Sequence, residues 1–147
     1  MTNETRNDLF YVCALIEYIS RSTNNRRGDV IKKIGRKGLE KLMHDAQMDH
    51  CLSFEEVSDE VIAYFTIENG DFKPEEGSPY TIPGFQDIGK LYAIIIEDLA
   101  ESGREVDEMI RVFTSFMSDA ISNFRSDLYY QNPDYLECCI KEGYLLE

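Results

Sequence analysis

Apolar residues recur at helical spacing along every long segment of this chain, and this period constrains the fold more than any other feature. The clearest case is residues 105–124, where apolar side chains follow one another at steps of three and four over about five turns. Glu105, Asp107 and Glu108 fall in the first turn of this segment, where negative charge complements the helix dipole. No stretch alternates in the period of a strand. The pattern predicts an all-α fold, with one long helix over residues 105–124.

Further helices are predicted from the same period and from signals that start or stop a helix. The predicted segments are 5–21, 29–34, 38–46, 53–65, 86–100 and 133–140. Gly35 is expected to end the second of these helices, and Ser53 with Glu56 forms a capping box for the fourth. Asn132 followed by Pro133 is typical of a helix start. We therefore expect about seven helices.

Proline and glycine gather in the middle of the chain and suggest two small packed helical units. Three of the four prolines and four of the nine glycines fall between residues 70 and 89. We predict a first unit over residues 1–68, a connection over residues 69–85 and a second unit over residues 86–147. A length of 147 residues suits one ordinary domain or two very small ones.

Charge is distributed unevenly between the two halves. The formal charge of the whole chain is −13, so it should repel polyanions and is not a general nucleic-acid coat. Residues 1–50 have a net charge of +2, whereas residues 51–147 have a net charge of −15. Residues 21–41 contain eight cations and only two carboxylates. The cations are Arg21, Arg26, Arg27, Lys32, Lys33, Arg36, Lys37 and Lys41.

This basic patch has three interpretations. It resembles the electrostatics of a small helix-turn-helix DNA reader, in which its side chains would contact phosphates. The nucleic-acid-binding residues would then be Arg26, Arg27, Lys32, Lys33, Arg36 and Lys37. Alternatively, the patch meets an acidic surface, in this chain or in a partner protein, or it is only a solvated face. The next predicted helix presents Glu40, Asp45 and Asp49, which argues against DNA.

The residues give no indication of a catalytic, cofactor-binding or metal-binding site. His44 and His50 are six positions apart, which turns them about 240° apart on a helix. No phosphate-binding loop, nucleophile elbow or zinc motif is present in the sequence. The four cysteines lack Cys-x-x-Cys spacing and are expected to be free packing residues. We expect a non-enzymatic protein without a cofactor or metal.

The amino terminus and the apolar segments bear on location. No apolar run approaches the 18 or so residues that span a bilayer, and residues 1–6 do not begin a secretory signal. We expect a cytoplasmic protein without membrane contact.

Three tyrosines gather around a predicted turn and the start of the last helix. They are Tyr129, Tyr130 and Tyr135. Tyrosine at such a place suits a protein interface, because its ring buries area and its hydroxyl finds a partner. The alternative is that Tyr129 or Tyr130 fills the seam between the last two helices. The first interpretation makes these three tyrosines candidate partner-binding residues.

Several stretches resemble a family of small bacterial helical proteins of uncharacterised function. The similarity covers about residues 7–66 and is carried by residues 10–19, the Gly38-Leu39 step and residues 50–62. Residues 88–92 and 129–135 look like companion segments encoded with that family. Such genes neighbour an ADP-ribosyltransferase-like protein, in an arrangement similar to toxin–antitoxin operons. The resemblance implies a toxin-like protein partner from the same operon and supplies no catalytic residue.

These observations lead to one expected function and one alternative. We expect a protein-binding module, an antitoxin-like or accessory component of a toxin–antitoxin-type operon, whose acidic second unit masks a basic surface of its partner. The alternative is a small DNA-binding transcriptional regulator that uses the basic patch of residues 21–41. A homodimer is left open.

Overall fold

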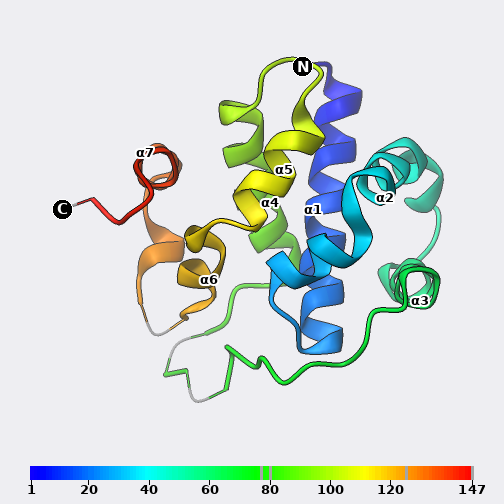
Figure 1. Ribbon diagram of the computed structural model, residues 1–147, viewed down its shortest axis with the longest axis horizontal. Coiled ribbons are helices and arrows are strands. Elements are labelled where there is room, and N and C mark those ends of the chain that lie inside the picture. Colours follow the sequence, from blue (N-terminus) through cyan, green and yellow to red (C-terminus); the bar gives the residue numbers. More distant parts are fainter. Residues whose placement is uncertain (77, 80, 125, 147) are drawn as a thin grey trace.

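The computed structural model describes residues 1–76, 78–79, 81–124 and 126–146 (Figure 1). Within these residues the chain forms seven α-helices, one short 3₁₀-helix and no strand, which confirms the predicted all-α class. The elements are α1 (Asn3–Thr23), α2 (Arg27–Asp49), α3 (Phe54–Phe65), α4 (Phe85–Leu99), α5 (Glu105–Phe113), α6 (Phe116–Ser122), η1 (Leu128–Tyr130) and α7 (Pro133–Glu142). None of these helices is both long and apolar enough to span a membrane.

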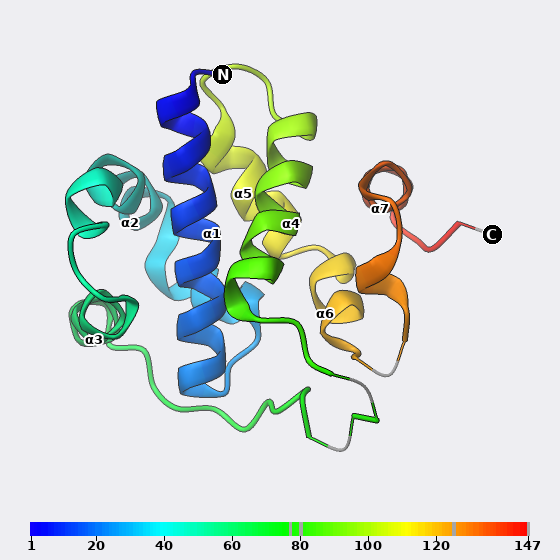
Figure 2. The same cartoon turned by 180° about the vertical axis from the view of Figure 1, so that it is seen from behind.

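Helix α1 is the central helix of the fold. Every residue from Leu9 to Glu17 except Phe10 is buried, so this stretch is enclosed on nearly all sides rather than along one stripe. The later part of α2 and helix α3 lie on one side of α1, and α4 lies on the other (Figures 1 and 2). Helix α4 crosses α1 closely at Gly89, where a Cβ atom would lie 2.6 Å from the Cα and nitrogen of Ala14. Only glycine fits this crossing.

One apolar core extends across the predicted boundary between units. Its members come from α1 and α2 as well as from α4 to α7. The described part of residues 67–84 contains no helix, as expected for a connection. The helices before and after it nevertheless share their core, because α4 packs against α1 and α5 packs against α2. The two predicted units therefore share one apolar core, and their division into separate units stays a prediction.

The predicted single helix over residues 105–124 is wrong, because the chain breaks between α5 and α6. The hydroxyl of Thr114 donates to the carbonyl of Ile110 at 2.6 Å, and that of Ser115 donates to the carbonyl of Val112 at 2.7 Å. Such bonds compete with the helical backbone pattern. The amino-terminal end of α2 also packs tightly here, since a Cβ on Gly28 would lie 3.3 Å from the Phe113 carbonyl oxygen.

The predicted stop and start signals are confirmed. Gly35 has φ +72°, so α2 consists of two arms that correspond to the predicted helices 29–34 and 38–46. The Ser53 side chain accepts a bond from the Glu56 nitrogen at 3.1 Å. Asn132 caps α7, and Pro133 follows as its first residue.

Candidate functional site

The three tyrosines of the last turn have different environments. Tyr130 is 69% exposed, whereas Tyr129 and Tyr135 are half-buried against the core. The rings of Tyr129 and Tyr130 meet edge to face, with centroids 4.9 Å apart. The Tyr135 hydroxyl donates to the carbonyl of Leu146 at 2.6 Å. Tyr130 is thus accessible to a partner. Tyr129 packs against the core, which agrees with the alternative interpretation for that residue, and Tyr135 is half-buried as well.

The end of the chain folds back beside this turn and adds apolar surface. Leu145 and Leu146 line a shallow groove together with Leu128, Gln131 and Tyr135. Tyr144 is 59% exposed and Leu145 is 49% exposed. We call Tyr130, Tyr144 and Leu145 together the carboxy-terminal face: Leu145 lines the groove, and Tyr130 and Tyr144 are exposed next to groove residues in the sequence. Sequence reasoning missed its last two members, because a short chain end after a helix carries no period that shows where it lies.

The arginines of the basic patch are held by carboxylates of the same chain. Arg27 is 3% exposed, so its predicted contact with phosphate is wrong. Arg26 pairs with Asp119 of α6 at 3.0 Å, and Arg36 pairs with Asp107 of α5. For these arginines the structure supports the interpretation that the patch meets an acidic surface within the chain.

Three of the four lysines of the patch remain available, since Lys41 pairs with Asp45. Lys32, Lys33 and Lys37 are exposed on α2 and form no ion pair with any residue that the structure describes. We call them the unpaired lysines of α2. Three cations on a chain of formal charge −13 form a weak polyanion site, because the summed field of the chain opposes the approach of phosphate.

Arg27 lies at the centre of a buried polar network. Its Nε and Nη2 donate to the two carboxylate oxygens of Glu17 at 2.7 and 3.0 Å. Its Nη1 donates to the Ser122 hydroxyl, the Ser118 carbonyl and the Tyr92 hydroxyl, at 2.6, 2.8 and 3.1 Å. Burial alone lowers the pKa of Arg27, but Glu17, Tyr92 and Asp119 together outweigh it and the pKa is raised. The guanidinium stays charged and joins α1, α2, α4 and α6.

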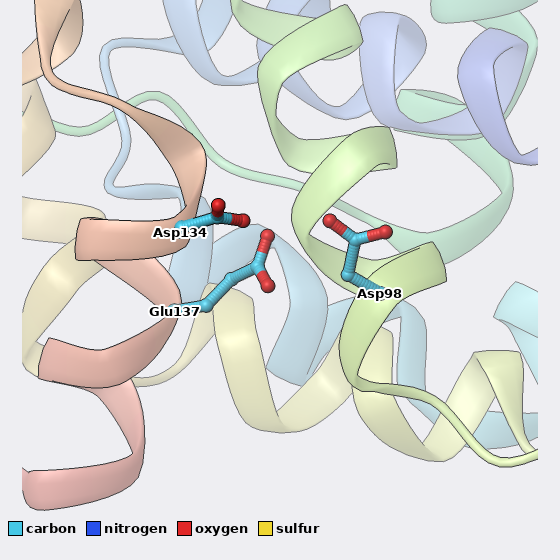
Figure 3. A group of neighbouring side chains, drawn as sticks. All are labelled: Asp98, Asp134 and Glu137. Atoms are coloured by element: carbon cyan, nitrogen blue, oxygen red, sulfur yellow. The ribbon is translucent and has the colours of Figure 1, made fainter.

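A cluster of three carboxyl groups bridges α4 and α7 (Figure 3). Asp98 of α4 faces Asp134 and Glu137 of α7, with an oxygen of each lying within 4.8 Å of the others. Glu137 Oε2 is buried and makes no hydrogen bond with a described residue. Burial and then the Asp98 carboxyl raise the pKa of Glu137 to about 8.

This carboxyl cluster can share a proton, or it can offer oxygen ligands to a divalent cation. Asp98 and Asp134 are exposed, so the cluster opens to solvent. The spacing of Asp134 and Glu137 on one helix is visible in the sequence, but such pairs are common in an acidic chain. Asp98 comes from another helix, and only the fold brings it there.

The histidines and cysteines do not converge on one site. His44 contacts Asp45 at 3.2 Å, while the His50 ring lies 4.3 Å from that of Tyr11. All four cysteines are free: Cys13 and Cys139 are buried, and Cys51 and Cys138 are exposed. The predicted packing role is confirmed for the buried pair and is wrong for the exposed pair.

Comparison with known proteins gave no match: no family model, no curated protein and no solved structure is significantly similar to this chain. The resemblance to the bacterial helical family therefore stays a prediction.

Proposed function

We propose that this chain is a non-enzymatic protein-binding module, antitoxin-like or accessory in type, which binds its partner through the carboxy-terminal face. The observation that carries this proposal is the 69% exposure of Tyr130, whose ring projects from a short 3₁₀ turn. Exposed tyrosine is enriched at protein interfaces because its rigid ring and its hydroxyl can both contact a partner at a low cost in conformational entropy. Tyr144 and Leu145 add further apolar area.

The partner presents a basic surface in this proposal. Arg26, Arg27 and Arg36 are held within the chain, so its accessible charge is strongly acidic. Asp127 and Asp134 lie close to Tyr130 in the chain and are exposed. Complementary charge speeds encounter and disfavours wrong partners. A toxin-like protein encoded in the same operon, as the family resemblance implies, is the partner we favour.

The cysteines bear on where such a module acts. Cys51 and Cys138 are exposed and free. Unpaired accessible thiols suit a reducing compartment, because oxidising compartments favour disulfides. We propose the cytoplasm as the location.

Comparative capture tests the proposed function. Wild-type protein, the double variant Tyr130→Ala/Tyr144→Ala and the control Met48→Ala would serve as baits for quantitative mass spectrometry. Met48 is 73% exposed but belongs to α2, so the control removes exposed apolar area at another place. Each protein that wild type captures would then be purified and its dissociation constant measured with all three baits.

The double variant should bind the basic partner about tenfold or more weakly, as for an interface hot spot, and the control should bind like wild type. Binding should also weaken as salt rises, since charge contributes to it. Recovery of the bait alone, or equal affinities for all three baits, would contradict the proposed function.

A further inference from the structure

A second groove lies between the later arm of α2 and helix α3, at the opposite end of the molecule from α7 (Figures 1 and 2). Leu42, Val57 and Val61 line it and are buried, so its floor is apolar. Phe65 is half-buried beside them. Tyr64, 72% exposed, lines the edge and meets Phe65 edge to face, with ring centroids 4.8 Å apart. The groove thus offers apolar area and an accessible aromatic ring.

The rim of this groove is acidic. Asp45 is paired with Lys41 at 2.6 Å, but Asp49 and Glu60 form no ion pair within the described part of the chain. Burial, and then the carboxylates of Asp45 and Glu60, raise the pKa of Asp49. Like charges are therefore crowded at the rim, and a cation placed there would relieve their repulsion.

Helix α3 adds to the negative charge around the groove, because it carries acidic residues and no lysine or arginine. Its twelve residues include no lysine or arginine. Its carboxylates are Glu55, Glu56, Asp59 and Glu60, and none of them forms an ion pair with a described residue. The outer surface of α3 therefore attracts positive charge along its length.

We propose that the groove between α2 and α3 binds a basic amphipathic helix of a partner protein. Apolar side chains of that helix pack on Leu42, Val57 and Val61, and its lysines or arginines lie on Asp49 and Glu60. Helix-in-groove binding of this kind places apolar anchors at positions i, i+3, i+4 and i+7. The unpaired carboxylates repel nucleic acid, so they select a basic protein segment. This surface is separate from the carboxy-terminal face, and the two proposals can fail independently.

The test uses a defined probe, an amphipathic helical peptide of about 18 residues built from leucine at i, i+3, i+4 and i+7 with lysine elsewhere. A peptide of the same composition without that spacing is its control. Glu60→Lys reverses a rim charge, and Glu101→Lys makes the same change after α4, away from the groove. Tyr64→Ala removes the aromatic edge, and Tyr130→Ala alters only the carboxy-terminal face. Circular dichroism would verify that each variant is folded.

The amphipathic peptide should bind wild type, with changes in amide resonances concentrated in the later arm of α2 and in α3. Glu60→Lys should weaken this binding about tenfold or more, because attraction becomes repulsion beside an apolar floor. Glu101→Lys should weaken it less than about twofold, since a distant exposed charge is screened by salt. Tyr64→Ala should weaken it about fivefold, and Tyr130→Ala should leave it unchanged.

Four results would overturn this inference. They are no binding of the amphipathic peptide, equal binding of the peptide without the helical spacing, equal losses from the two charge reversals, and resonance changes centred on α7. Self-association of the free protein that Glu60→Lys abolishes would also overturn it, because a second copy would then be the occupant. The unpaired lysines of α2 are the cations through which a second copy would bind.

Discussion

Replacing Arg27 by methionine should leave the Glu17 carboxylate buried without its main partner. Both side chains are 3% exposed. Arg21 still donates to Glu17 Oε2 at 3.0 Å, but Oε1 loses the 2.7 Å bond from Arg27. Removing one partner of a buried ion pair costs about 3–5 kcal/mol, against a total unfolding free energy of about 5–15 kcal/mol. The Arg27→Met variant should lose a large part of its stability.

Urea unfolding followed by circular dichroism measures this loss. With a denaturant slope of about 1–3 kcal/mol per molar urea, the midpoint should fall by at least about 1 M. Arg26→Met is the matched control, because Arg26 pairs with Asp119 at 3.0 Å while both side chains are about half exposed. An exposed pair contributes less than about 1 kcal/mol. Arg26→Met should therefore have a midpoint close to that of wild type.

The double variant Glu17→Met/Arg27→Met separates the effect of an unpaired buried charge from the effect of lost packing. Apolar replacement of both partners is often neutral, so the double variant should be more stable than Arg27→Met alone. Equal small losses for Arg27→Met and Arg26→Met would refute this reasoning. So would a double variant whose loss equals the sum of the two single losses, since the residues would then be uncoupled.

Three further outcomes are expected. The pKa of Glu137 is raised from an ordinary 4.5 to about 8, so its contribution to stability is present in acid and is lost as pH rises through 8. Urea midpoints measured from about pH 5 to pH 9 should show this fall for wild type and for the control Glu142→Gln. Glu137→Gln should not show it. Gly89→Ala places a Cβ against the backbone of Ala14 and should lower the free energy of unfolding by about 1–3 kcal/mol or more in the same assay. In the control Gly84→Ala the Cβ would lie 3.5 Å from Asp87, and the loss should be less than about 1 kcal/mol. Replacing the unpaired lysines of α2 with alanine should leave retention on duplex DNA unchanged at about 0.15 M salt, and a loss of retention would instead support the DNA-binding regulator.

The sequence was informative wherever a local signal decides the structure. Gly35, Ser53 and Asn132 act through their own backbone or side chain on the nearest turn, so their positions as breaks and caps were predicted correctly. The break at Thr114 and Ser115 was not predicted. Serine and threonine hydroxyls also occur inside helices, and here the helix ends where α2 packs against the break.

The candidate sites depend on contacts between distant segments, and there the sequence was less informative. Arg26 and Arg27 are neighbours of the same type, yet one is half exposed and the other is buried. The difference comes from Glu17, ten residues earlier, which interrupts the otherwise apolar residues 9–19 and is a signal for a buried cation. The placement of Asp98 beside Glu137 has no comparable local signal, because each has another carboxylate near it on its own helix, as is common in an acidic chain.

The enclosure of α1 also affects how the protein forms during synthesis. Helix α1 leaves the ribosome first, but it must wait for about 76 further residues before α4, which covers one of its sides, is complete. At about 5–20 residues per second this interval is roughly 4–15 s, which is long compared with helix formation. During that time the side of α1 that α4 later covers is exposed on the nascent chain, and its apolar surface is open to aggregation until α4 is complete.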